Sequence, residues 1–368
     1  MSAIWRTEKL SVCIEINPRE ALNKGVLAKK VGMDKLQPFC RDISEYEITE
    51  YSGGVKFRNG DTVMARITPC LENGKTAMIS ILDENEVGFG STEYIVFRAK
   101  EGVTDPYYVF YLACSPMVRD IAIKSMVGSS GRQRVQTDVV QNIEIPFPDF
   151  ETQTRISSIL KLLDDKISIN NEINNNLEQQ AQAIYHQMFI ENRNSNWKEG
   201  NLSDLVSIKY GKDHKKLDDG CYPVYGSGGI MRYVEKPLYT GESVLIPRKG
   251  TLNNVMYVNG AFWSVDTMFY TEMLRPNIAK FVYHFVKGKD LASLNAGSAV
   301  PSMTTNILNA MQLYIPDDIT LCIFEETVAP MYSQMQENEK QSVNLAKLRD
   351  TLLPRLMSGE LDVSDIDL

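Results

Sequence analysis

The fold is decided by residues 151–188, which read ETQTRISSILKLLDDKISINNEINNNLEQQAQAIYHQM. Apolar, alanine or amide side chains recur there in alternating steps of four and three, the heptad pattern of a helix that packs lengthwise against another helix. The stretch contains no proline or glycine that would break the helix. At 1.5 Å per residue it would be about 55–60 Å long, which suggests a spacer between two domains. The predicted seam consists of Ile156, Leu160, Leu163, Ile167, Asn170, Asn174, Leu177, Ala181, Ile184 and Met188.

A second seam with the same spacing lies near the C-terminus. Its members are Met331, Met335, Asn338, Ser342, Leu345, Leu352 and Leu356, with Arg349 as a charged exception. Pro330 is expected to break or begin this helix, because proline is tolerated in a first turn and not in a helix interior. An antiparallel pair would bring Asn170 and Asn174 opposite Asn338 and Ser342, and such a polar layer fixes register and orientation. The alternative is that the asparagine-rich stretch is simply exposed to solvent.

Composition bounds the class of protein. The chain has 368 residues, enough for two or three domains, and a formal net charge of −8. Residues 193–317 carry 14 Lys and Arg against 11 Asp and Glu, so this part is net basic and a polyanion is not excluded as partner. The absence of a long apolar run or signal-peptide pattern predicts a cytoplasmic protein with no membrane contact. Six cysteines are scattered singly, which indicates neither a disulfide framework nor a zinc site.

The chain also repeats itself. Gly60–Ala65 (GDTVMA) matches Gly241–Ile246 (GESVLI), Gly128-Ser129 corresponds to Gly297-Ser298, and Ile143–Pro146 (IEIP) matches Leu313–Pro316 (LYIP). A helical stretch follows each copy. We therefore predict an α+β protein in which two similar mixed α/β domains are separated by two long helices that form an antiparallel coiled coil, a pseudo-twofold internal repeat. The predicted segments are a first domain at 1–150, a spacer helix at 151–192, a second domain at 193–317 and a C-terminal helix with an acidic tail at 318–368.

Three patterns that suggest catalysis are each incomplete. Asp105-Pro106-Tyr107-Tyr108 approaches the Asp/Asn-Pro-Pro-Tyr motif of amino-methyltransferases, but its third position is tyrosine and no cofactor fingerprint lies nearby. Gly74-Lys75-Thr76 resembles the end of a phosphate-binding loop, but Pro69 stands where the first glycine belongs. The three histidines have no ligand spacing with another His or Cys. The sequence thus predicts a non-catalytic chain that binds no metal or cofactor of its own.

With catalysis unsupported, we consider binding. Side chains suited to binding DNA lie in loops at matching places in both halves of the chain. Arginine can pair bidentately with guanine and the amide of glutamine or asparagine with adenine, whereas lysines neutralise phosphates. Each cluster could equally be an ordinary solvated loop, but the repeat favours function where both halves agree. The candidate DNA-binding residues are Arg66, Asn73, Lys75, Arg132, Gln133, Arg134, Lys212, Lys215, Lys216, Arg248, Lys249, Asn253, Ser298 and Ser302.

The whole chain resembles the DNA specificity subunits of type I restriction-modification systems. The resemblance rests on residues 143–148 (IEIPFP) followed by 151–153 (ETQ), on residues 156–167 of the first helix, and on residues 352–361 (LLPRLMSGEL) near the C-terminus. Residues 222–226 (YPVYG) are also similar to members of that family. The second half departs from the family pattern, because Leu321-Cys322 replaces a polar pair after the proline-rich strand.

This resemblance implies two target recognition domains, each reading one half of a bipartite site in double-stranded DNA, with the helices fixing the spacing. It also implies two methyltransferase subunits as partners, which carry S-adenosylmethionine and methylate adenine N6, and motor-nuclease subunits that use ATP and Mg²⁺. Two alternatives are a scaffold or antagonist that kept the architecture without reading DNA, and a fused DNA methyltransferase.

Overall fold

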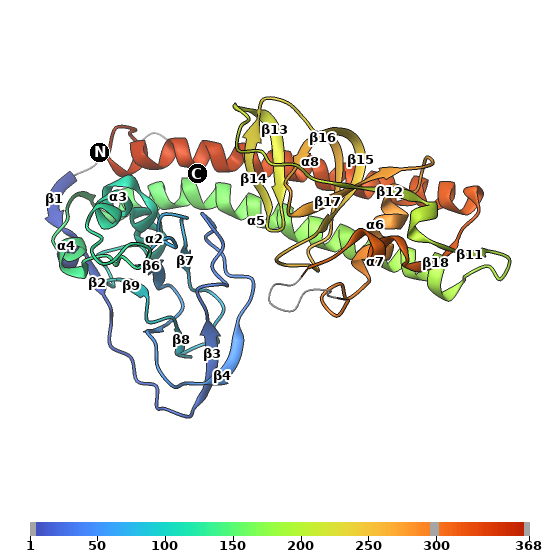
Figure 1. Cartoon of the computed structure of the whole chain (residues 1–368). Coiled ribbons are helices and arrows are strands. Elements are labelled where there is room, and N and C mark those ends of the chain that lie inside the picture. Colours follow the sequence, from blue (N-terminus) through green and yellow to red (C-terminus); the bar gives the residue numbers. More distant parts are fainter. Residues whose placement is uncertain (1–4, 295–301, 364–368) are drawn as a thin grey trace. The chain divides into compact units, whose positions relative to one another are not determined.

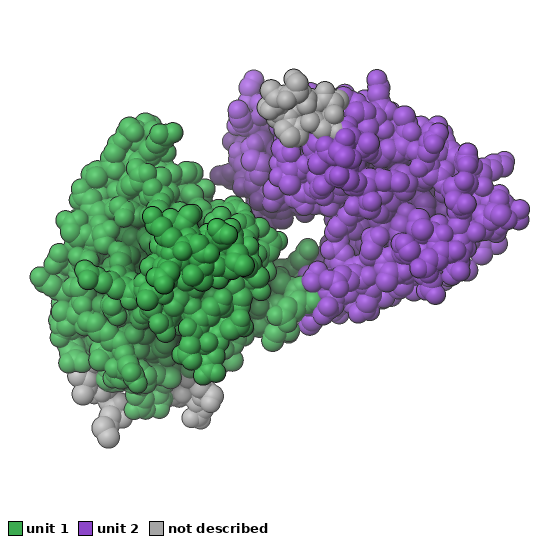
Figure 2. Space-filling view, turned by 90° about the horizontal axis from the view of Figure 1, so that it is seen from below, with its two compact units in different colours: residues 1–172, 338–368 green, residues 173–337 purple. Residues whose placement is uncertain are grey.

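The computed structural model describes residues 5–294 and 302–363. Its contacts divide into two compact units, one formed by residues 1–172 with 338–368 and the other by residues 173–337 (Figure 2). The two boundaries fall inside the two long helices, Phe150–His186 (α5) and Asp318–Met357 (α8) (Figure 1). Each unit therefore contains one segment of each long helix.

The first unit is built from short strands and four small helices. Residues Tyr94–Ala99 (β9) are buried along most of their length, as expected for the centre of a sheet. The sheets have the orders β1-β10, β2-β9-β6-β7 and β4-β3-β8-β5. The elements are β1 (Trp5–Lys9), α1 (Leu10–Cys13), β2 (Ile14–Ile16), β3 (Leu27–Val31), β4 (Glu47–Glu50), β5 (Lys56–Phe57), β6 (Thr62–Ala65), β7 (Thr76–Met78), β8 (Gly88–Gly90), α2 (Pro106–Cys114), α3 (Pro116–Lys124), α4 (Thr137–Gln141) and β10 (Glu144–Pro148).

Helix α2 joins the sheet core to the long helices. Asp105 caps it by accepting a hydrogen bond from the N–H of Tyr108 at 2.8 Å, and Pro106 occupies the first turn, where its missing N–H costs nothing. One continuous apolar cluster then runs from β6 and β9 through α2 to Leu160 and Leu356 of the long helices. The long helices are therefore part of the core of this unit.

The second unit is organised around one six-stranded sheet with the order β12-β17-β15-β16-β13-β14 and a separate β11-β18 pair. Its elements are η1 (Gln187–Glu191, a π-helix), β11 (Lys198–Asn201), η2 (Leu202–Asp204), β12 (Val206–Tyr210), β13 (Asp219–Gly226), β14 (Gly229–Val234), β15 (Tyr239–Pro247), β16 (Met256–Ser264), β17 (Met268–Met273), α6 (Ala279–Lys287), α7 (Thr305–Asn309) and β18 (Gln312–Ile315). A second apolar cluster joins α6 to Tyr185 and Phe324 of the long helices.

The predicted internal repeat is present in the pairing of the strands. The arrangement β2-β9-β6 of the first unit returns as β12-β17-β15 in the second, and β1-β10 returns as β11-β18. Ala65 pairs with Tyr94, and Pro247 pairs with Met268 in the same place of the second sheet. The residue equivalent to Ala65 is therefore Pro247, so the match of Ala65 with Ile246 drawn from the sequence is wrong by one position.

The match of Ile143–Pro146 with Leu313–Pro316 is wrong by two positions. The N–H of Leu10 donates to the carbonyl of Ile143 at 2.8 Å, and in the second unit the N–H of Leu202 donates to that of Met311 at 2.9 Å. The residue equivalent to Ile143 is therefore Met311.

The two long helices are α5 (Phe150–His186) and α8 (Asp318–Met357). Each begins at an aspartate cap: Asp149 accepts the N–H of Thr152 at 2.9 Å, and Asp317 accepts that of Thr320 at 2.8 Å. The expectation that Pro330 breaks or begins the second helix is wrong, because α8 starts twelve residues earlier and continues through it. Pro330 is exposed, so the carbonyl that loses its helical partner can be hydrated.

The helices run antiparallel within each unit. In the first unit Asp164 contacts Arg349 and Asn170 contacts Gln341. The residue numbers of the contacts on α8 therefore decrease as those on α5 increase. In the second unit the contacts of Asn174 with Met335 and of Tyr185 with Phe324 descend in the same way. Every side chain of the two predicted seams is buried or half-buried in the structure.

The amide residues of the seams meet. Asn170, which is fully buried, donates from Nδ2 to Oε1 of Gln341 at 2.9 Å and to Oγ of Ser342 at 3.2 Å. Asn174 donates to the carbonyl of Met335 at 3.2 Å. Within the described residues Oδ1 of Asn170 has no hydrogen-bond partner, so this layer carries an uncompensated cost of burial.

The double variant Asn170→Leu with Asn174→Leu should therefore raise the free energy of unfolding, by about 1 kcal/mol or more, because apolar contacts replace an incompletely satisfied polar layer. The same change should weaken the preference for one register and allow other associations of the helices. Thermal denaturation measures the first effect, and light scattering after size exclusion measures the second. Unchanged stability would count against a buried seam at this point.

Candidate nucleic-acid interface

Two loops of the first unit meet and carry most of its candidate residues. One loop, residues 66–75, joins β6 to β7, and the other, residues 127–134, follows α3. The N–H of Thr68 donates to the carbonyl of Gln133 at 3.0 Å, and Ile67 forms a β-bridge with Arg134. Arg134 is also bonded through both backbone groups to Val127, at 2.9 and 3.0 Å. The backbone of Arg134 is therefore held from two sides.

The side chains of Arg66 and Arg134 converge on Glu93, the residue just before β9. Arg134 donates to Glu93 from Nε at 2.9 Å and from Nη2 at 2.7 Å. Nε of Arg66 lies 3.9 Å from the same carboxylate. The hydrogen bonds from Arg134 lower the pKa of Glu93 below its usual value although partial burial opposes this, so the carboxylate stays charged.

The other candidates of the first unit are divided. Arg132 is exposed and Gln133 half-buried beside these arginines, while Asn73 is exposed near the β7 end of its loop. Lys75 turns inward and donates from Nζ to the carbonyl of Met33 at 2.7 Å. The structure thus brings Arg66, Gln133 and Arg134 together and directs Lys75 away from them.

The second unit repeats the backbone geometry around Arg248. Its N–H donates to the carbonyl of Thr267 at 2.8 Å, and its carbonyl accepts the N–H of Met303 at 2.9 Å. Arg66 makes the matching bonds to the carbonyl of Glu93, at 2.9 Å, and to the N–H of Val135, at 2.8 Å. Arg66 and Arg248 are therefore equivalent positions of the repeat.

The same equivalence extends to the next residues. The β-bridge between Lys249 and Ser302 corresponds to the bridge between Ile67 and Arg134 in the first unit. Ser302 is thus drawn to the loop of Arg248, whereas the candidate Ser298 lies outside the described residues.

Arg248 is oriented by an aromatic ring rather than by a carboxylate. Its guanidinium carbon lies 5.4 Å from the ring centroid of Tyr210, and Nη1 donates to the carbonyl of Asp266 at 3.1 Å. Asn253 is turned to its own unit, because its amide donates to Asp290 at 3.2 Å and accepts the N–H of Ala292 at 2.9 Å. The side chain of Asn253 therefore stabilises its own loop through these hydrogen bonds.

The lysine-rich segment lies at the end of β16. The N–H of Lys212 donates to the carbonyl of Ser264 at 2.8 Å, and the indole of Trp263 donates to the carbonyl of Lys212 at 2.9 Å. Lys212, Lys215 and Lys216 are exposed. Because the chain runs from Ser264 directly to Thr267, Lys212 lies in the same loop region as Arg248.

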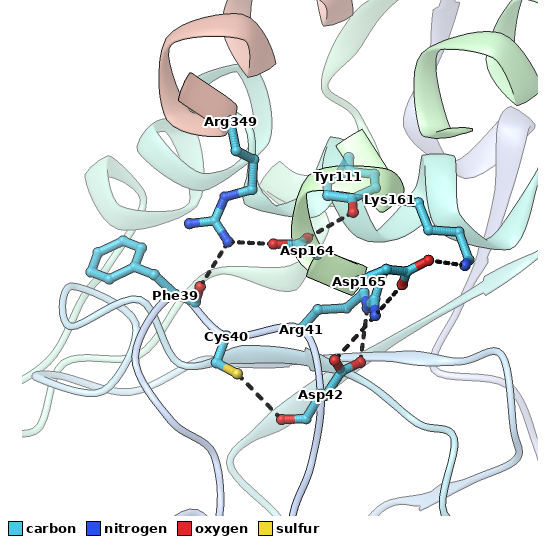
Figure 3. Close-up of polar contacts among 9 residues, drawn as sticks. All are labelled: Phe39, Cys40, Arg41, Asp42, Tyr111, Lys161, Asp164, Asp165 and Arg349. Carbon is cyan, nitrogen blue, oxygen red and sulfur yellow. Dashed lines mark hydrogen bonds and ion pairs between the residues drawn. The ribbon is translucent and has the colours of Figure 1, made fainter. Parts of the chain in front are cut away.

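A buried polar cluster holds the long helices to the first unit (Figure 3). Asp164 of α5 accepts from Nη1 of Arg349 at 2.7 Å and from the hydroxyl of Tyr111 at 2.7 Å. Arg349 also donates to the carbonyl of Phe39 at 3.2 Å. At the next position of α5, Arg41 pairs with Asp165 at 2.8 Å. Burial raises the pKa of Tyr111 well above its usual value, so its hydroxyl acts as a donor.

The second unit fills the equivalent positions with different chemistry. Counted from the starts of their helices, Tyr332 and His284 correspond to Asp164 and Tyr111. His284 is fully buried and lies 2.9 Å from the hydroxyl of Tyr332 and 2.7 Å from the amide oxygen of Gln182. Burial lowers the pKa of His284 to about 4, so the ring is neutral at pH 7. A neutral hydrogen-bonded chain here replaces the ion pair of the first unit.

Sequence reasoning missed Glu93 and the buried partners of Arg349. No group of three or more His, Cys, Asp or Glu residues that could hold a metal ion occurs within residues 5–294 and 302–363. In the same part of the chain, no helix combines the length and apolar character that a membrane crossing requires.

Comparison with known proteins gives consistent matches. Residues 5–179 and 194–320 match the family model of the type I restriction modification DNA specificity domain. The type I restriction enzyme HindI specificity subunit of Haemophilus influenzae is 30% identical over 411 residues, covering 83% of this chain and 87% of the relative. The EcoAI specificity subunit of Escherichia coli is 32% identical over 157 residues, which is 41% of this chain and only 26% of that relative.

A solved structure shares the fold. The crystal structure of the type I restriction-modification S subunit from M. genitalium has a TM-score of 0.56 and 15% sequence identity, with 96% of each chain covered. At 15% sequence identity this similarity shows a shared fold and nothing more.

Proposed function

Because the chain belongs to the type I restriction modification DNA specificity family, we propose that it is a sequence-specific DNA-recognition subunit in which each unit reads one half of a bipartite site. The observation that carries this proposal is the repeat of one arginine geometry. Arg66 and Arg248 follow equivalent strands and make the same two backbone hydrogen bonds, and each lies in a loop with further polar side chains. A base-reading group presented twice on one chain suits a site with two separate halves.

The charge around each arginine supports a role at DNA. Arg132 and Arg134 flank Gln133 in the first unit. In the second unit the exposed Lys212 lies in the loop region of Arg248, and the exposed Lys215 and Lys216 follow it in the chain. Lysine and arginine at phosphates supply affinity, whereas the oriented arginines and amides supply sequence preference. The formal net charge of −8 does not oppose this role, because affinity depends on the local distribution of charge.

Helices α5 and α8 present apolar side chains that the seam does not use. Leu162, Ile169 and Leu348, all in the first unit, are 58%, 47% and 47% exposed. Methyltransferase subunits that dock on the helix pair would cover such side chains. In this proposal those partners bind S-adenosylmethionine and methylate adenine, and motor-nuclease subunits supply ATP- and Mg²⁺-dependent cleavage.

Arg248→Ala should change recognition of one half-site only. Loss of a bidentate arginine contact costs about 1–3 kcal/mol of discrimination at one base pair. Mapping of methylated adenines in cells that carry the methyltransferase subunits should then show a relaxed position in one half of the site, and Arg66→Ala should relax the other half. Lys236→Ala, which removes a positive charge at an exposed side chain of the second unit, is the control and should leave the site unchanged.

The proposal fails if methylation is the same with and without the chain. It also fails if the complex of chain and methyltransferase shows salt-dependent DNA binding with no preferred sequence, because charge alone then explains the binding.

A further inference from the structure

The ion pair of Glu93 with Arg134 leaves a defined part of the guanidinium free. Glu93 accepts from Nε and Nη2, the two nitrogens along one side of the guanidinium. Arginine has five N–H donors in a planar fork, so the outer edge of Nη1 and Nη2 keeps its donors. That edge has the bidentate geometry that pairs with O6 and N7 of guanine.

The surroundings of the pair keep this edge in place. The backbone of Arg134 is bonded to Val127 and bridged to Ile67, and its side chain is 45% exposed. Glu93 is less exposed, at 24%, and its own backbone carbonyl accepts the N–H of Arg66. The carboxylate therefore lies beneath the arginine as part of the folded unit, and the arginine lies outward.

A carboxylate in this position opposes binding to DNA in general. It cancels positive charge next to two arginines and adds a negative charge where phosphates approach. Such an arrangement favours selectivity over affinity. A guanidinium held by a carboxylate cannot reorient toward whichever phosphate is nearby, so it binds only a group that fits its fixed position.

The second unit shows what the same fold does without this carboxylate. The carbonyl that accepts from Arg248 belongs to Thr267, so threonine stands where the first unit has Glu93. Arg248 is held instead by the ring of Tyr210 and the carbonyl of Asp266. The residue equivalent to Arg134 is Ser302. The two units thus restrain different arginines, Arg134 with a carboxylate and Arg248 with a ring and a carbonyl.

We propose that Glu93 is a positioning residue that fixes Arg134 so that its free edge reads a guanine in the half-site of the first unit. This inference rests on the proposed function. It adds a residue that touches no DNA and sets which base is preferred, and it predicts that the two half-sites respond to different substitutions.

The test is Glu93→Gln in the full chain with its methyltransferase subunits, measured by binding to the preferred site and to variants with each base at every position of that half-site. Discrimination at one guanine should fall about tenfold, the order of one bidentate contact. Binding to unrelated DNA should stay the same or tighten at low salt, because a negative charge is lost. The other half-site should be read as before.

Two variants separate positioning from charge. Glu47→Gln removes the same charge from an ion pair with Lys30, made at 3.1 Å on β3 and β4, and should alter neither binding nor discrimination. Arg134→Lys keeps the positive charge without the planar edge, so it should lose the same discrimination, and Glu93→Gln should then add no further loss.

A third variant covers the case in which the glutamine variant is unstable. Glu93→Asp keeps the charge with a shorter reach, so it should lose discrimination at the guanine without tighter binding to unrelated DNA. Full discrimination in the aspartate variant would show that the charge alone matters, and it would contradict a positioning role.

Uniform changes of affinity with unchanged base preference would assign Arg134 to a phosphate and overturn the inference. Failure of the proposed function looks different, because the unsubstituted complex would then show no preferred sequence at all.

Discussion

Replacing Arg349 with leucine should lower the free energy of unfolding of the first unit by about 3–5 kcal/mol, the usual result of removing one partner of a buried ion pair. Asp164 is only 5% exposed and would keep the hydroxyl of Tyr111 as its remaining hydrogen-bond donor. Burial opposes the charge on Arg349, yet Asp164 and Asp350 raise its pKa above the ordinary value, so the guanidinium stays charged at neutral pH. The carbonyl of Phe39 would lose a donor as well.

The matched control removes Arg349, Asp164 and Tyr111 together. The triple variant Tyr111→Phe, Asp164→Leu and Arg349→Leu leaves neither charge of this ion pair behind, and apolar replacements of a buried ion pair are often neutral or stabilising. It should therefore recover most of the lost stability. The equivalent of Arg349 in the second unit is Ala181, which is fully buried, so this fold already accepts an apolar residue at the position.

Hydrogen exchange measured by mass spectrometry reports the loss locally. Peptides from residues 150–172 and from α2 should lose protection in Arg349→Leu and regain it in the triple variant, while peptides from β15 and β17 should change little. Equal protection in Arg349→Leu and the unsubstituted chain would show that the ion pair contributes little to the stability of the first unit.

The periodic parts of the structure could be predicted from the sequence because their causes are local. The heptad spacing of Ile156, Leu160 and Leu163 follows directly from the helix period, and the repeat follows from the matching strand sequences. Pro330 misled because the cost of proline in a helix depends on exposure, and exposure is a property of the folded unit. The one-residue error at Ala65 has a similar origin, since strand register is set by pairing across the sheet.

The candidate interface was predictable in its residue types and only partly in its geometry. Arg66, Arg134 and Arg248 could be found because arginines in loops of both halves are chemically suited to DNA. Glu93 could not, because it is separated by 41 residues from Arg134 and only the meeting of two loops brings them together. Lys75 and Asn253 show the reverse case, in which a suitable side chain is used by its own unit.

Removing one heptad from each long helix, residues 170–176 and 333–339, should abolish methylation at the native bipartite site. Each deletion takes out seven residues, so the a and d steps on both sides stay in phase and the apolar seams remain continuous. The deletions spare Tyr332 and Glu178, which contact the core of the second unit through His284 and Tyr283. Both units should therefore still fold, on helices shortened by about 10 Å.

The expected loss follows from the different pitches of the two molecules. About 10 Å of B-DNA is three base pairs, which at 10–10.5 base pairs per turn rotate a half-site by roughly 100°. A heptad returns a helix to within about 20° of its starting face. If the DNA spacer is also shortened by three base pairs, the distance between the half-sites again matches the helices. One half-site is then rotated away from the unit that reads it, so no simple deletion in the DNA should restore full methylation.

Asn175→Ala with Glu337→Ala is the control, because it alters exposed side chains within the two deleted segments without changing helix length or the seam. That variant should keep the native site, whereas the paired deletion should lose it although circular dichroism and thermal unfolding show two folded units. Methylation of a library of sites with every spacer length distinguishes the outcomes. If the shortened chain modifies the native site at the native rate, the helices do not set the spacing, and recognition of two half-sites must then depend on the partner subunits that hold the DNA.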